Sequence, residues 1–184
     1  GVALREAADV ADESRELRAH VADQPCGDRR MLGDGALDAR RGQRDAAEAT
    51  LRRAVAAHPH EAEAHYALAL TLAQQGRVVD ALGPLSQASR LRPEEPRYAY
   101  VQGIALNQLR RTEEAVAILR ANLERHPRHR DSLFALATIE RDRANITEAE
   151  QLAAAAVALN PADREAAALL AQLRDLRQRL PTRP

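Results

Sequence analysis

Residues 96–129 read PRYAYVQGIALNQLRRTEEAVAILRANLERHPRH, and the small residues and proline of this stretch recur along the chain every 34 residues. A proline stands near the end of each copy, and an alanine precedes it by twelve residues. A residue with almost no side chain precedes the proline by twenty-four residues. The three series are Pro59, Pro93, Pro127 and Pro161; Ala47, Ala81, Ala115 and Ala149; and Gly35, Ala69, Gly103 and Ala137.

Three series that share one period indicate one structural unit copied along the chain and stacked on itself. Small residues at two fixed positions allow the two helices of a hairpin to approach closely, because no branched side chain holds them apart. The proline follows the second helix and prevents it from continuing. Between the helices, Gly42 and Gly76 are expected to supply the turn, where Arg110 and Ala144 stand in later copies. We therefore expect an all-α solenoid of antiparallel helix pairs.

These residues resemble the tetratricopeptide repeat, a helix pair with the same period and pattern. The resemblance implies a right-handed superhelix. The first copy is the poorest match, because Asp34 and Asp38 stand at positions that are usually apolar, and its first helix is expected to be short or frayed. The four expected copies are residues 28–61, 62–95, 96–129 and 130–163.

The segments outside the four copies carry their own expectations. Residues 1–27 predict an amphipathic helix, which is either an N-terminal cap or a degenerate half-repeat. Residues 164–179 continue the first-helix pattern and predict a capping helix over the last pair. Residues 180–184 are expected to be disordered. The alanine-rich stretch 149–171 is either an oligomer contact or a well-packed end, so self-association is a possible interaction.

The composition narrows the class of protein. The 184 residues include 27 basic and 27 acidic side chains, and this balance argues against a nucleic-acid partner. All basic residues are arginine, which excludes Schiff-base chemistry and a P-loop because both need lysine. No apolar run approaches the roughly 20 residues that cross a bilayer, and no signal peptide is visible. We expect a soluble bacterial protein without membrane insertion, in the cytoplasm or the periplasm.

Residues suited to catalysis or metal binding are sparse. Cys26 is the only cysteine, which excludes an internal disulfide and a cysteine metal cluster. His58 and His126 occupy the same place in two copies, so a role at the helix end is favoured over a metal site. No nucleophile–base–acid spacing and no glycine-rich phosphate loop stand out. We expect a protein that is not an enzyme, with no catalytic, cofactor-binding or metal-binding residues.

The resemblance assigns certain first-helix positions to a concave face. One of them holds Tyr66, Tyr100 and Phe134, three of the chain's four aromatic residues, in consecutive copies. Such side chains are typical anchors of recognition surfaces, so we expect an apolar-aromatic groove that binds an extended or helical partner segment. The alternative is that the rings only pack between neighbouring first helices. The expected groove residues are Tyr66, Leu70, Gln74, Tyr100, Ile104, Asn107, Gln108, Phe134, Thr138 and Arg141.

Two hypotheses of function follow. The first is a non-catalytic scaffold that binds a protein or peptide partner in this groove. The second rests on residues 98–142, which resemble the C-terminal tetratricopeptide arrays of large bacterial multihaem cytochrome c-like proteins. That resemblance implies an accessory domain of a larger redox or other enzyme, which organises its partners in the periplasm. The chain has no C-x-x-C-H motif, so it cannot itself attach haem through that motif.

Overall fold

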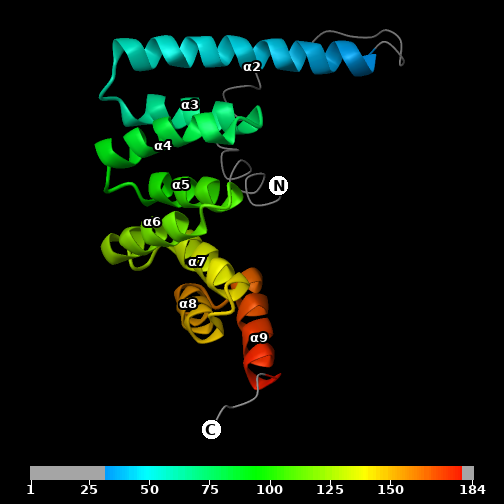
Figure 1. Cartoon of the computed structure of the whole chain (residues 1–184), viewed down its shortest axis with the longest axis vertical. Helices are drawn as coiled ribbons and strands as arrows, with labels where there is room; N and C mark the ends of the chain where they lie inside the picture. The colour runs from blue at the N-terminus through cyan, green and yellow to red at the C-terminus, as the bar shows by residue number, and fades with distance from the viewer. Residues whose placement is uncertain (1–31, 180–184) are drawn as a thin grey trace. The chain divides into compact units, whose positions relative to one another are not determined.

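A computed structural model describes residues 32–179, with side chains placed from residue 44 onward, and its regular structure is helical throughout this range (Figure 1). The predicted helix within residues 1–27, Cys26 and the predicted disordered tail at 180–184 lie outside the described residues. The helices are α2 (Leu32–Ala57), α3 (Ala62–Gln74), α4 (Val78–Leu91), α5 (Pro96–Gln108), α6 (Thr112–Arg125), α7 (Arg130–Asp142), α8 (Ile146–Leu159) and α9 (Arg164–Arg179).

The described residues form two compact units, 32–92 and 93–179. In the first unit, α2 packs on α3 and α3 packs on α4. In the second unit, each helix from α5 to α9 packs on the next, and α7 also contacts α5 and α9. Packing between consecutive helices confirms the expected all-α solenoid of helix pairs.

The turn between the two helices of a pair has the same backbone conformation in three copies. Gly76, Arg110 and Ala144 occupy equivalent positions and have positive φ angles of 80°, 63° and 64°. The N–H of the following residue then donates to a carbonyl in the last turn of the first helix, as from Arg77 to Leu72 at 2.9 Å. This hydrogen bond is typical of a Schellman helix ending, and glycine adopts the required φ without steric cost. Gly76 therefore lies in the turn as expected.

The expected turn at Gly42 is wrong. Gly42 lies inside α2, which runs without interruption from Leu32 to Ala57 (Figure 1). The sequence offers a physical reason, because Asp34 and Asp38 stand where the next copy has leucines that are buried. A first helix with carboxylates at these positions lacks the apolar side that would fold back onto a second helix.

Small residues lie where the helices of a pair approach each other. In α5, a Cβ atom added to Gly103 would lie 2.8 Å from Cγ of Leu119 in α6, closer than real Cβ atoms come. This contact confirms that the small residues permit close packing of the pair. The alanines at the equivalent positions of the other pairs are completely buried: Ala69 and Ala81 in the first unit, and Ala137 and Ala149 in the second.

The last helix, α9, covers the pair formed by α7 and α8. Its Leu169, Leu170 and Leu173 belong to a buried cluster with Ala137 of α7 and with several residues of α8. Glu150 of α8 pairs with two arginines of α9, which adds ionic contacts at the edge of this cluster. Across residues 32–179, no helix is both long enough and apolar enough to cross a membrane.

Candidate protein-binding site

The structure places the ten expected groove residues on α3, α5 and α7, each of which is the first helix of its pair. The α5 and α7 residues lie in the same unit, on helices that contact each other. The α3 residues lie in the other unit. They are Tyr66, Leu70 and Gln74 on α3; Tyr100, Ile104, Asn107 and Gln108 on α5; and Phe134, Thr138 and Arg141 on α7.

The aromatic rings differ in how much of their surface reaches solvent. Tyr66 is only 7% exposed, so little of its ring is available to a partner. Tyr100 and Phe134 are half-buried, as are Ile104 and Thr138 one helical turn further along. We call these last four residues the α5–α7 face. They combine packed rings with apolar surface that still reaches solvent.

The ring of Tyr100 contacts the imidazole of His129, the residue that precedes α7. The two ring centroids are 5.9 Å apart and the ring planes meet at 67°. This edge-to-face arrangement is a favoured geometry for aromatic pairs. The contact therefore ties a side chain of the α5–α7 face to the start of the next helix.

The ring of Phe134 lies under the guanidinium of Arg130, whose central carbon is 4.8 Å from the ring centroid. Arg130 donates two hydrogen bonds to Asp163, at 2.6 and 3.1 Å, and a third to Glu165 at 2.9 Å. The hydrogen bonds from Arg130 lower the pKa of the Asp163 carboxyl, and the Asp163 carboxylate raises the pKa of Arg130. Arg130 is therefore held in place over one side of the Phe134 ring.

The polar residues of the expected groove differ in whether they have partners within the chain. Asn107 accepts a hydrogen bond from the hydroxyl of Thr112 at 3.2 Å. Arg141 donates to Asp142 at 2.9 Å and contacts the side-chain oxygen of Gln172 at 3.5 Å. Gln108 is exposed, and Gln74 is exposed on α3. Asn107 and Arg141 thus have partners within the chain, while Gln108 extends into solvent.

A buried polar network connects to Tyr100 through His129, and one irregular residue of the repeat points to it. Asn122 is 3% exposed, at a position where the other copies have alanine. Its amide donates to the carbonyl of Pro96 at 2.9 Å and to the hydroxyl of Ser132 at 2.8 Å. That hydroxyl also contacts Nδ1 of His129 at 2.9 Å. The irregular Asn122 marked the position, but its partners come from α5 and α7.

A second network surrounds Glu140, which sequence reasoning missed. Its carboxylate is fully buried, at a position where two earlier copies have leucine. It accepts hydrogen bonds from Arg120 at 3.1 Å, Arg143 at 3.0 Å and Asn145 at 2.6 Å. These donors come from α6 and from the turn that follows α7. The network is typical of a structural ion-pair cluster that joins neighbouring helices.

Three histidines, His65, His126 and His129, have hydrogen-bond partners within the chain. The ring Nε2 of His65 donates to the carbonyl of Pro59 at 2.9 Å, and that of His126 donates to the carbonyl of Pro93 at 3.0 Å. Within residues 32–179, no three His, Cys, Asp or Glu side chains are grouped so that they could hold a metal ion.

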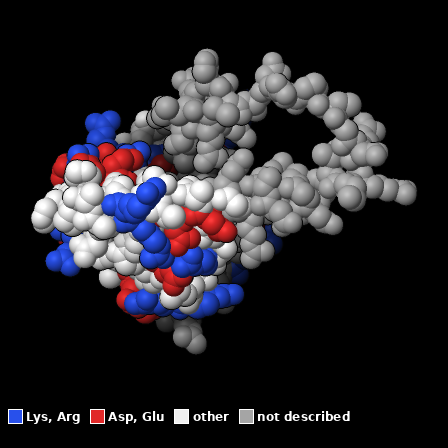
Figure 2. Space-filling view, turned by 90° about the horizontal axis from the view of Figure 1, so that it is seen from above, with Lys and Arg blue, Asp and Glu red and all other residues white. Residues whose placement is uncertain are grey.

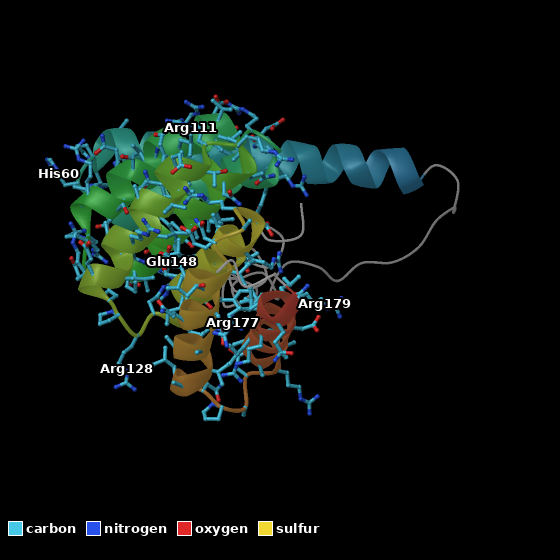
Figure 3. The ribbon with its side chains drawn as sticks, turned by 60° about the horizontal axis from the view of Figure 1, so that its bottom comes forward. His60, Arg111, Arg128, Glu148, Arg177 and Arg179 are labelled. Carbon is cyan, nitrogen blue, oxygen red and sulfur yellow. The ribbon has the colours of Figure 1, made fainter. Side chains whose placement is uncertain are left out.

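The charged surface is mixed. On the face drawn in Figure 2, basic and acidic side chains lie next to one another among uncharged residues. Figure 3 shows Arg128, in the loop before α7, extending away from the ribbon. Because charges of opposite sign are neighbours, the face shown has no continuous basic surface.

Comparison with known proteins identifies similar chains. A family model described as tetratricopeptide repeat matches residues 31–96, 84–130 and 100–164. No curated protein matches the chain in sequence. A structure of MamA has a TM-score of 0.68 and 17% identity, over 78% of this chain and 84% of that chain. MamA from Desulfovibrio magneticus RS-1 has a TM-score of 0.65 and 19% identity, over 76% of this chain and 78% of that chain.

A tetratricopeptide repeat protein from Parabacteroides merdae ATCC 43184 is similar at a TM-score of 0.66 and 19% identity, over 80% of this chain and 60% of that chain. At these identities the structural likeness shows the fold alone. The resemblance to arrays of multihaem cytochrome-like proteins is not tested by these comparisons and stays a prediction.

Proposed function

The chain belongs to the tetratricopeptide repeat family, and we propose that it is a non-catalytic scaffold whose α5–α7 face binds an extended or helical segment of a protein partner. Proteins with this fold generally serve as protein-interaction scaffolds and bind protein partners. The observation that carries the proposal is the pair of half-buried rings, Tyr100 and Phe134, at equivalent positions on two contacting helices.

The chemistry of these rings suits an anchoring role. Each ring is held by a neighbour, Tyr100 by His129 and Phe134 by Arg130, so little side-chain entropy remains to be lost on binding. Rigid, partly exposed aromatic side chains contribute a large share of the binding energy in protein interfaces. Ile104 and Thr138 extend this surface by one helical turn, which suits the apolar side chains of a partner helix or strand.

The test is partner capture by the full chain and by a Tyr100→Ala/Phe134→Ala variant, followed by affinity measurement with the purified partner. We expect the double substitution to weaken binding by about thirtyfold or more, or roughly 2 kcal/mol, because two anchors are truncated. Circular dichroism establishes that the variant is still helical.

The matched control is Val79→Ala, which trims an apolar side chain that is 67% exposed on the second helix α4. It should leave the affinity unchanged. Equal affinity of the wild type and the double variant for every partner would show that the α5–α7 face is not the binding surface.

A further inference from the structure

His129 caps the N-terminus of α7 with an imidazole where the other copies have a carboxylate. The equivalent residues are Glu61, Glu95 and Asp163. Asp163 caps α9 by accepting hydrogen bonds from the backbone N–H groups of the residues two and three positions later, each at 3.1 Å. His129 accepts the N–H of Ser132 at Nδ1, at 3.3 Å. Glu61 and Glu95 make no such hydrogen bond, so at this position of the repeat the capping side chains are those of Asp163 and His129. Of these two, histidine is the residue type that ordinarily titrates near neutral pH.

The hydrogen bonds define the protonation state of His129. Because the Ser132 N–H donates to Nδ1, that nitrogen carries a lone pair and the proton of the neutral ring resides on Nε2. The Ser132 hydroxyl is 2.9 Å from the same nitrogen and accepts a hydrogen bond from Asn122, and its own proton is free to donate to Nδ1 of the neutral ring. The bond from the Ser132 N–H requires the neutral imidazole, because a backbone N–H can only donate.

Protonation would place a hydrogen on Nδ1, opposite the backbone N–H of Ser132. It would remove the cap of α7 and put a positive charge at a helix N-terminus, where the helix dipole disfavours cations. The groups around His129 shift its pKa in both directions. Burial, the largest effect, lowers the pKa of His129 below its ordinary value of 6.5, and the neighbouring His126 adds to this, while Asp131 and Glu95 oppose it.

Protonation of His129 affects the α5–α7 face through two contacts. The imidazole packs against the ring of Tyr100, and the Asn122–Ser132 pair behind it is bonded to the carbonyl of Pro96 at the start of α5. A change at His129 therefore alters the support of the helix that carries Tyr100 and of the ring itself.

We propose that His129 is a proton-sensitive switch of the α5–α7 face, in which the neutral imidazole holds Tyr100 in position for a protein partner and acid releases it. The effect on partner binding rests on the function proposed above. Since the pKa of His129 is lowered in the capped state, protons favour the uncapped state. Affinity is full above the ordinary histidine pKa and falls as the pH drops through the lowered value.

The first test needs no partner. The full chain is labelled with 3-fluorotyrosine, its three fluorine resonances are assigned with Tyr66→Phe and Tyr98→Phe variants, and spectra are recorded from about pH 7 to pH 5. We expect the Tyr100 resonance to titrate in the wild type and to stay constant in His129→Asn, because asparagine caps a helix without titrating. His60→Asn replaces an exposed histidine and should preserve the titration. A Tyr100 resonance that is constant in the wild type, or that titrates equally in His129→Asn, would overturn the switch.

The second test measures binding. An amphipathic peptide is selected on the full chain at about pH 7.5 from a displayed library, and is kept only if Tyr100→Ala/Phe134→Ala abolishes its binding. Its Kd should rise by about fivefold or more on going to about pH 5.5, which is the lower end of the coupling usually found between two linked sites. The Kd should be nearly constant in His129→Asn.

The two proposals fail in different ways. If no peptide depends on the two rings, the proposed function is overturned, while the fluorine titration still decides whether the switch exists. If a ring-dependent peptide loses affinity equally in the wild type and His129→Asn, the switch is overturned and the binding face stands.

Discussion

Gly103 marks a close approach of α5 and α6, because a Cβ atom at this residue would lie 2.8 and 2.9 Å from two side-chain carbons of Leu119. We expect Gly103→Ala to lower the free energy of unfolding by about 1–3 kcal/mol through overpacking. Replacing glycine by alanine inside a helix usually stabilises it by about 1 kcal/mol, which offsets part of this loss. We expect the overpacking to be the larger effect, so the variant should be less stable than the wild type. Urea denaturation followed by circular dichroism measures the difference. A stabilised variant would show that the two helices separate without cost.

Single residues also show how a copy can depart from the repeat without losing the fold. Asn122 replaces an alanine, and Glu140 replaces a leucine, yet both are buried. Each has hydrogen-bond donors or acceptors from neighbouring helices at 2.8–3.1 Å, and Glu140 has a further donor, Asn145, in the turn after α7 at 2.6 Å. Burial of a polar group is tolerated when its bonds are made, and here those bonds join adjacent helices.

At the scale of the element, Gly42 and Gly76 occupy equivalent positions in the repeat but different structures. Nothing lies within 4 Å of a Cβ atom added to either residue. A side chain at either position would therefore meet no neighbouring atoms, and the two substitutions differ only in their effect on the backbone. Gly42→Ala should raise the free energy of unfolding by about 0.5–1 kcal/mol, because alanine is the better helix former. Gly76→Ala should lower it by about 1 kcal/mol, because its φ of 80° disfavours a side chain.

Thermal and urea unfolding of the two variants provide the comparison. Each serves as the control for the other, since the substitution is the same. Destabilisation of both to a similar degree would mean that Gly42 also lies in a turn, and that α2 is not one continuous helix.

At the scale of the whole molecule, residues 93–184 contain the contacts that a stable unit needs. The buried clusters around Leu173 and Leu133, the Glu140 network and the Arg130–Asp163 pair all lie within this range. Stability in helical repeats comes from each pair and its neighbours rather than from one central core. We expect a fragment of residues 93–184 to be helical and to unfold cooperatively, as measured by circular dichroism.

The matched control for this fragment is Leu173→Asp, which places a carboxylate at a fully buried position of α9. It should abolish the cooperative transition, because an unpaired buried charge is too costly. A wild-type fragment that is unfolded alone and folds only when residues 1–92 are added would contradict the prediction.

The parts of the fold that the sequence predicted are those that repeat. The helix pairs, the turn at Gly76 and the close approach at Gly103 each depend on a local requirement that recurs in several copies. The prediction failed at Gly42, where one copy lacks its apolar residues and the period alone is not enough. The groove residues stay a prediction, although Tyr100 and Phe134 lie on contacting helices and are partly exposed.

The sequence by itself therefore determined that this protein is an array of helix pairs, because small residues, turn residues and prolines act through the local backbone and recur with one period. Only the tertiary structure decided which side chains bond to Asn122, Glu140 and His129. Asn122 and the carbonyl of Pro96 are 26 residues apart in the chain, and Arg120 and Glu140 are 20 apart. Such bonds depend on the distance and orientation of neighbouring helices, which no local pattern specifies.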